Sequence, residues 1–347
     1  MAGGRASASP QHCELGARQG STASHPTVII NPSFAGRVLT KWVVATDREV
    51  FRSDSDSQIT LHQRATALNQ KIHLGISTCP NDTFTFHGLM TQSVDWCGLE
   101  FQVELIDIQQ LNDRLFDGEF DAAKASFHAA LLLSNETVVL PSGSALGFGV
   151  GPLMLSSESG ATPTNNQQVT LCPGQHTTAS LLNSLFYPQT ARVEHVVFSE
   201  IMPKLQRKEA DFGVCIHEGR FTWQEQGLGL VEDLGTRWET ETGCPLPLGG
   251  IVARRSLTDE VVAKVQAVIR DSLEFALADR DAALPTMRRY AQEFDDEVLM
   301  KHVDLYVNEW TTDLGDTGGN ALRELSERAQ SIGLVAPSDS PIEVFAA

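Results

Sequence analysis

Short apolar strand patterns alternate with helical patterns along most of this chain, and this alternation restricts its fold more than any other feature of the sequence. Units of strand, helix and strand of this length form parallel sheets covered by helices. The sequence therefore predicts an α/β fold with two such units. The strand patterns cover residues 72–77, 99–108 and 121–126 in a first series, and residues 167–172, 191–198 and 210–216 in a second.

The two series contain a short internal echo. Residues 111–126 and residues 202–217 both run from a helix through an acidic turn into a strand, and Asp121 of the first segment corresponds to Asp211 of the second. An echo of this kind suggests two lobes built on one plan. A mostly helical stretch follows residue 255, and residues 296–310 carry an apolar helical stripe that includes His302.

Polar side chains stand at the ends of corresponding strands. Lys124 and Ser126 end a strand of the first series, and His217 follows a strand of the second. Ligands of open α/β sheets bind outside the carboxyl ends of the strands. We therefore expect the two lobes to face each other across a central cleft that holds a small-molecule substrate.

The net charge argues against two classes of partner. The chain has 26 Lys and Arg against 44 Asp and Glu, and its formal net charge is -18. Phosphate backbones and anionic membranes repel such a surface, and no apolar run approaches the roughly 18 residues that span a bilayer. We expect no nucleic-acid partner and no membrane insertion, whereas a monomer and a homodimer both stay open.

The six cysteines are scattered, and none belongs to a CxxC pair or to a Cys/His cluster with metal-site spacing. This pattern is typical of reduced thiols in a cytoplasmic protein and predicts no metal site. Cys79 precedes a turn in which Asn81 or Asp82 is expected to cap a helix that begins near Thr83. No base stands near Cys79 in the sequence, so the pattern does not favour it as a nucleophile.

Residues 1–70 differ from the rest of the chain. The first part is rich in Gly, Ala and Ser, lacks the apolar core of a secretory signal, and is predicted to be a disordered extension. A targeting leader and an upstream-extended start are the alternatives. We expect residues 71–160 and 253–347 to form one discontinuous lobe and residues 161–252 to form the other, with the glycines of residues 145–152 allowing a tight crossing between the lobes.

Each candidate site residue has a structural explanation beside its functional one. His217 is either a general base or a strand-end histidine bonded to a neighbour. Thr177 and Thr178 either bind an anion at a helix start or simply cap that helix. Lys124 and Ser126 share one face of a strand, where they either hold a carboxylate or enolate oxygen or face solvent.

Several long motifs together identify a family. In order, they are ISTCPNDTFTFHGL, DIQQLNDRLFDGEFDAAKASFHA, LPSGSALGFGVGPL, PGQHTTA, CIHEGRFTW and WETETGCPLPLGGIVARR. With these motifs the chain resembles the 1,4-dihydroxy-6-naphthoate synthases of the futalosine route to menaquinone. The resemblance covers residues 72–255 and extends into the helical tail.

The resemblance implies a two-lobed fold like that of type II periplasmic binding proteins, with the substrate between the lobes. It also implies a carbon–carbon lyase without metal or organic cofactor, which converts cyclic de-hypoxanthinylfutalosine to 1,4-dihydroxy-6-naphthoate and dihydroxyacetone. His217 matches the proton acceptor of the family. The positions that match the substrate-binding residues are Asn112, Lys124, Ala125, Ser126, Thr177, Thr178 and Ala179.

Two positions depart from the family pattern. Gln175 replaces a basic residue, and Ala125 replaces a leucine, but neither change affects the expected base. Chorismate dehydratase of the same pathway and a solute-binding protein for a small carboxylate are the alternative functions. The absence of an export signal counts against the second. The roles of Glu218 and Arg220 beside His217 stay open.

Overall fold

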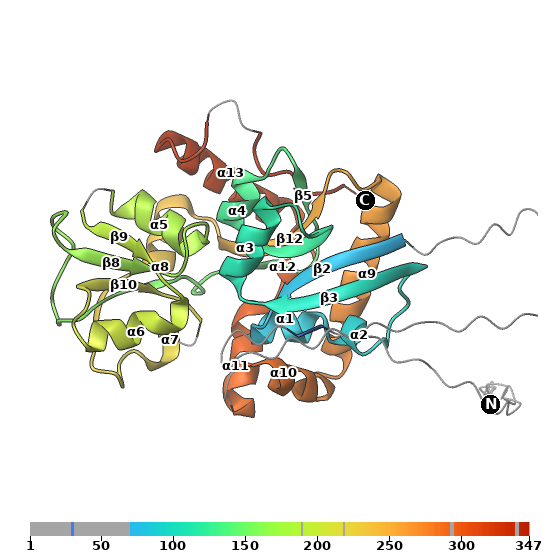
Figure 1. Cartoon of the computed structure of the whole chain (residues 1–347), viewed down its shortest axis with the longest axis horizontal. Coiled ribbons are helices and arrows are strands. Elements are labelled where there is room, and N and C mark those ends of the chain that lie inside the picture. The colour runs from blue at the N-terminus through green and yellow to red at the C-terminus, as the bar shows by residue number, and fades with distance from the viewer. Residues whose placement is uncertain are drawn as a thin grey trace, which may run out of the picture.

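The computed structural model describes residues 29–30, 70–188, 190–217, 219–291, 295–336 and 340–346. The predicted N-terminal extension lies outside the described residues, apart from residues 29–30 and residue 70. Two lobes, each built on its own sheet, lie side by side (Figure 1).

The larger lobe contains a seven-stranded sheet and the smaller lobe a five-stranded one. The larger sheet has the order β1-β3-β2-β4-β12-β5, with β6 also paired to β12, and the smaller has the order β11-β7-β10-β8-β9. The strands of the larger sheet are β1 (Ile29–Ile30), β2 (Gln70–Ser77), β3 (Leu99–Ile106), β4 (Ala122–Ser126), β5 (Thr137–Val139), β6 (Ala145–Gly147) and β12 (Leu246–Arg254). Those of the smaller sheet are β7 (Leu153–Ser156), β8 (Val169–Cys172), β9 (Arg192–His195), β10 (Phe212–Cys215) and β11 (Gly229–Asp233).

Helices cover both sheets and complete the larger lobe at its C-terminal end (Figure 1). In the part of the chain that the structure describes, every helix is too short or too polar to cross a bilayer. The helices are α1 (Pro80–Thr85), α2 (His87–Met90), α3 (Ile108–Phe116), α4 (Phe127–Leu132), α5 (Thr178–Phe186), α6 (Phe198–Gln206), α7 (Gly219–Thr222), α8 (Leu234–Thr242), α9 (Asp259–Ala278), η1 (Asp281–Ala283), α10 (Leu284–Tyr290), α11 (Asp296–Tyr306), α12 (Glu309–Thr312) and α13 (Gly315–Ser331).

The two parallel units predicted from the sequence are present. In the larger lobe β2 pairs in parallel with both β3 and β4, and in the smaller lobe β8 pairs in parallel with both β9 and β10. An antiparallel strand completes each set, β12 beside β4 and β7 beside β10. The lobes therefore share the strand orders β3-β2-β4-β12 and β9-β8-β10-β7.

The internal echo of the sequence has a structural counterpart in each lobe. Asp121 accepts a hydrogen bond at Oδ2 from the backbone N–H of His73 at 2.8 Å, and Asp211 accepts one at Oδ2 from the N–H of Val169 at 2.7 Å. Both aspartates stand directly before the strand that follows the turn. Each carboxylate thus joins the strand that it precedes to the neighbouring parallel strand.

Within the described residues, the chain crosses between the sheets twice. It leaves β6 for β7 through residues 148–152 and returns from α8 to β12 through residues 243–245. At the first crossing Gly151 packs against the backbone of Gly235, where an added Cβ would lie 2.2 Å from the Gly235 Cα. The crossing thus needs glycine. We propose lobe boundaries at these two crossings rather than at residues 160 and 252, because β7 pairs within the smaller sheet and β12 within the larger.

Apolar packing continues from one lobe to the other. One cluster of buried side chains contains Phe127 of α4, Leu181 of α5 and Trp238 of α8, all fully shielded from solvent. Burying a side chain of this kind stabilises a fold by about 1.5–3 kcal/mol. The lobes therefore hold their relative position in part through a shared core.

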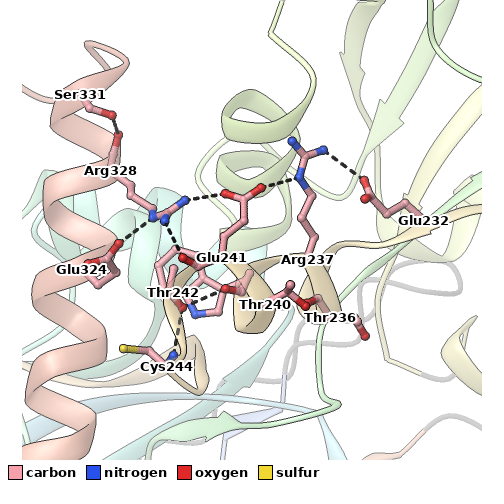
Figure 2. Close-up of polar contacts among 11 residues, drawn as sticks. Glu232, Thr236, Arg237, Thr240, Glu241, Thr242, Cys244, Glu324, Arg328 and Ser331 are labelled. Carbon is pink, nitrogen blue, oxygen red and sulfur yellow. Dashed lines mark hydrogen bonds and ion pairs between the residues drawn. The ribbon is translucent and has the colours of Figure 1, made fainter.

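Charged side chains reinforce this connection at the surface. Arg328 of α13 pairs with Glu241 of α8 at 2.8 Å, and Glu241 also accepts a hydrogen bond from Arg237 at 2.9 Å (Figure 2). Arg237 extends to Glu232 of β11, and Arg328 extends to Glu324 on its own helix. Since α13 packs against β12, the network ties the larger lobe to α8 and β11 of the smaller one.

Candidate active site

A cavity of about 710 Å³, including its open mouth, lies where the carboxyl ends of strands from both sheets meet. Ser77 ends β2 and Ser126 ends β4, whereas His217 follows β10 in the other lobe. This is the position that strand order predicts for a ligand site in an open α/β sheet. The cavity is therefore the candidate active site.

His217 lines the cavity in an unusual backbone conformation. Its φ is +54°, in the left-handed region, although the residue is not glycine. Such a conformation costs about 1–3 kcal/mol and is concentrated at functional sites. The ring meets Phe198 edge to face at a centroid distance of 5.0 Å, and its Nε2 lies 3.6 Å from the Cys79 Sγ of the other lobe.

The contact between Cys79 and His217 was not predictable from their positions in the chain. No base stands near Cys79 in the sequence, but the fold places an imidazole beside its thiol. The expectation for the neighbouring helix was wrong, since α1 begins at Pro80 and Cys79 is its N-cap residue. Proline needs no backbone N–H partner at the first helical position, so the helix begins before Asn81 and Asp82.

Lys124 and Asp82 form a buried ion pair in the cavity wall. The Lys124 Nζ lies 2.8 Å from Asp82 Oδ1 and donates a second hydrogen bond to the carbonyl oxygen of Gly143 at 2.9 Å. Asn81 also donates to Asp82 Oδ1, whereas Asp82 Oδ2 is buried without a hydrogen-bond partner in the described part of the chain. Lys124 therefore does not face solvent.

Asn112 holds the end of β4 in place. Its side chain accepts a hydrogen bond from the backbone N–H of Ser126 at 3.0 Å and donates one to the Ser126 hydroxyl at 3.1 Å. Asn112 is fully buried and is not part of the cavity wall. Ala125 points to the opposite face of β4, into the apolar core, so its side chain does not line the cavity either.

The start of α5 forms part of the cavity wall. Thr177 is the N-cap residue and accepts a hydrogen bond from the N–H of Ser180, as the structural explanation requires. The Thr178 hydroxyl donates to the carbonyl oxygen of Leu248 at 2.7 Å. Both threonines and Ala179 also line the cavity, so the cap and the cavity wall are the same segment.

Most residues that line the cavity were not among the sequence predictions for the site, and three of them bear ionisable or hydroxyl groups from unexpected places. Asp82, His302 and Tyr306 line it, and His302 and Tyr306 come from α11, which is distant in sequence from every predicted site residue. In the sequence, Asp82 was only a polar residue within a conspicuous motif. His302 and Tyr306 were only members of an apolar helical stripe. His302 and Tyr306 can be recognised as site residues only because the fold brings α11 to the cavity.

Two residues that follow His217 were left without a role by the sequence, Glu218 directly before α7 and Arg220 within it. Glu218 lies outside the described residues. Arg220 donates to the carbonyl oxygen of Gly151 at 2.6 Å and pairs with Asp233 at 2.7 Å. Arg220 thus joins α7 to the crossing between the lobes.

Comparison with known proteins adds evidence that is independent of this geometry. A family model described as menaquinone biosynthesis matches residues 72–331, which is most of the chain. The chain belongs to this menaquinone biosynthesis family. The resemblance seen in the sequence motifs is thereby confirmed.

Two similar proteins are both named 1,4-dihydroxy-6-naphthoate synthase. The protein from Thermus thermophilus is 39% identical over 79% of this chain and 100% of its own length. The protein from Streptomyces coelicolor is 38% identical over 76% of this chain and 94% of its own length. Each of these two proteins is thus matched over at least 94% of its own length.

Solved structures confirm the expected fold. A protein from Archaeoglobus fulgidus is similar with a TM-score of 0.72 and 30% identity, over 76% of this chain and 98% of that one. The ligand-binding component of an import system from Staphylococcus aureus has a TM-score of 0.59 at 15% identity, over 80% of this chain and 97% of that one. This member of the menaquinone biosynthesis family thus has the two-lobed fold of type II periplasmic binding proteins.

Proposed function

We propose that this protein is a carbon–carbon lyase that converts cyclic de-hypoxanthinylfutalosine to 1,4-dihydroxy-6-naphthoate and dihydroxyacetone, with His217 as proton acceptor. The names of the two similar enzymes support the reaction. The observation that carries the role of His217 is its left-handed backbone at the wall of the cavity that Lys124 also lines, where its ring lies beside Cys79. We infer that the enzyme works in the cytoplasm.

The proposed chemistry begins with removal of a proton that a neighbouring carbonyl makes acidic. A positioned base of near-neutral pKa contributes about 10²–10⁴-fold to such a step. Formation of the aromatic product then drives the carbon–carbon cleavage. The thiol of Cys79, within 3.8 Å of both ring nitrogens, restricts the orientation of His217.

The remaining cavity groups bind and orient the substrate in this proposal. Ser126, Thr177 and Thr178 surround the space in which the substrate carboxylate would lie. Lys124 places a positive charge in the same wall, where it stabilises negative charge that develops on the substrate. Closure of the lobes would exclude water from the intermediate.

Mass spectrometry of purified protein with candidate substrates tests the reaction. We expect cyclic de-hypoxanthinylfutalosine to be consumed and 1,4-dihydroxy-6-naphthoate to form, and chorismate to be left unchanged. Dehydration of chorismate would instead identify the protein as the dehydratase of the same pathway. Tight binding of the cyclic compound without turnover would identify a solute-binding protein.

The His217→Asn variant tests the proton acceptor. We expect kcat to fall by at least about 100-fold, because the amide cannot take up the proton. His195→Asn is the matched control, since His195 is a histidine at the end of β9 in the smaller lobe but does not line the cavity. Equal kcat values for His217→Asn and the wild type, with both proteins folded, would remove His217 from this role.

A further inference from the structure

A second imidazole borders the cavity beside His217. His302 projects from α11 of the larger lobe, and its ring centroid lies 6.1 Å from that of His217, with an interplanar angle of 28°. On its own helix it contacts the Tyr306 ring at a centroid distance of 4.5 Å. Each lobe thus contributes one imidazole to the same part of the cavity wall.

The polar atoms of His302 have no partner in the described part of the chain. The residue is 5% exposed, and neither Nδ1 nor Nε2 makes a hydrogen bond. Buried polar groups in proteins are nearly always hydrogen-bonded, and an unsatisfied one costs about 1–3 kcal/mol. An imidazole that lines a cavity with both nitrogens unpaired therefore indicates a group that pairs with a bound ligand.

His302 is also held in a single protonation state. Burial, together with the neighbouring His217, lowers its pKa to about 3. Neither Lys124 nor Asp82 in the same wall is among the causes of this lowering. The ring is therefore neutral at physiological pH, with one N–H donor and one acceptor nitrogen.

We propose that His302 is a second catalytic residue, whose neutral N–H donates a hydrogen bond to the substrate oxygen that gains negative charge when His217 removes the proton. This inference rests on the proposed lyase function. The proton taken from the substrate passes to His217, and the N–H proton stays on His302. A neutral donor suits this task, because it stabilises the developing charge without transferring a second proton.

Three substitutions of His302 separate hydrogen bonding from packing. His302→Leu removes both nitrogens, whereas His302→Asn and His302→Gln place an amide N–H near the positions of Nδ1 and Nε2. We expect kcat for cyclic de-hypoxanthinylfutalosine to fall by about 100–1000-fold in His302→Leu, as after loss of an oxyanion donor. One of the two amide variants should have a kcat at least about tenfold higher than that of His302→Leu. The pH profile of kcat/KM should stay unchanged, because His302 does not titrate near neutral pH.

His87→Gln is the matched control. His87 is also a buried imidazole with a lowered pKa, but it bonds to Thr286 and lies outside the cavity wall. We expect its kcat to equal that of the wild type. Unchanged kcat in folded His302→Leu would overturn the inference, and so would equal losses in all three His302 variants, since these indicate packing alone.

Two further outcomes complete the test. If His302→Leu does not fold, ¹⁵N-histidine NMR of the wild type decides, with 1,4-dihydroxy-6-naphthoate as the probe. The product should shift the ring nitrogens of His302 and leave those of His87 in place, and unshifted His302 signals would overturn the inference. A wild type that leaves the substrate unchanged overturns the proposed function and this inference with it, whereas an active wild type beside an equally active His302→Leu overturns this inference alone.

Discussion

Asp82 and Lys124 face each other across a part of the cavity wall that is almost closed to solvent. Asp82 is 1% exposed and Lys124 is 5% exposed, and their charged atoms lie 2.8 Å apart. A buried pair of this kind adds little net stability, but loss of one partner leaves an uncompensated charge. The pair is therefore best tested by comparing single with double substitutions.

We expect Lys124→Met to lower the free energy of unfolding by about 3–5 kcal/mol, because it leaves the buried Asp82 carboxylate without its cationic partner. The double variant Asp82→Asn with Lys124→Met should lose less than the sum of the two single variants. Urea unfolding of the four proteins gives the coupling free energy. Strict additivity would mean that the two charges do not depend on each other.

At the scale of elements, the same unit of strand, helix and strand occurs in both lobes. In α3 and α6 the chain leaves the helix through a residue of positive φ, Gly118 in one lobe and Lys208 in the other, and then reaches the aspartate that joins two strands. Each aspartate accepts a backbone N–H of the neighbouring strand, that of His73 within β2 and that of Val169 at the start of β8. Loss of the carboxylate would leave that N–H without its acceptor.

We expect Asp121→Ala and Asp211→Ala each to reduce the free energy of unfolding by about 1–3 kcal/mol, because each removes a charged acceptor from a backbone N–H. Chemical denaturation measures both losses. Asp117→Ala is the control, since Asp117 is exposed at the end of α3, and its change should stay within about 0.5 kcal/mol. A loss for Asp121→Ala or Asp211→Ala no larger than that of the control would show that these carboxylates do not hold the strands.

At the scale of the whole molecule, a buried histidine joins the lobes. His128 of α4 lies 3.2 Å through Nδ1 from the carbonyl oxygen of Thr177, at the start of α5. Burial lowers its pKa from 6.5 to about 4, although the hydrogen bond to Thr177 acts in the opposite direction. The contact between the lobes therefore contains an imidazole that stays neutral between pH 6.5 and about 4, a range in which the same imidazole is protonated in the unfolded chain.

This shift makes stability depend on pH. Between pH 6.5 and about 4 the unfolded chain binds a proton at His128 that the folded chain does not, so the free energy of unfolding falls as the pH is lowered. When the pH is lowered from about 7.5 to about 4.5, we expect the free energy of unfolding of His128→Asn to fall by about 2–3 kcal/mol less than that of the wild type. Urea unfolding at the two pH values measures the difference, and equal losses in the two proteins would contradict it.

Much of the fold was predictable because its signals are local. The apolar periodicity of β2, β3 and β4, and of β8 and β10, identified strands that the structure contains. The resemblance of the motifs to a family indicated the two-lobed arrangement, and the comparisons confirm it. The expected lobe boundary at residue 252 falls within β12, which lies between β4 and β5 in the larger sheet.

The candidate site was predictable only in part. The cavity brings together His217, Lys124, Ser126, Thr177, Thr178 and Ala179, although their catalytic and binding roles stay predictions. Asn112 and Ala125 do not line the cavity. Asn112 supports the wall by its hydrogen bonds to Ser126, and Ala125 faces the apolar core. Local patterns cannot show which face of β4 meets the cavity, since that depends on where the second lobe lies.

The sequence alone determined the order of the predicted strands and helices, the internal echo and the family. Each of these depends on residues that lie close together in the chain, or on motifs that can be recognised without an alignment. Only the tertiary structure placed Cys79 beside His217 and brought His302 to the same cavity. The physical reason is distance along the chain. Contacts between lobes depend on sheet order and on helix docking, which no local periodicity specifies, and the chemistry of this protein lies in those contacts.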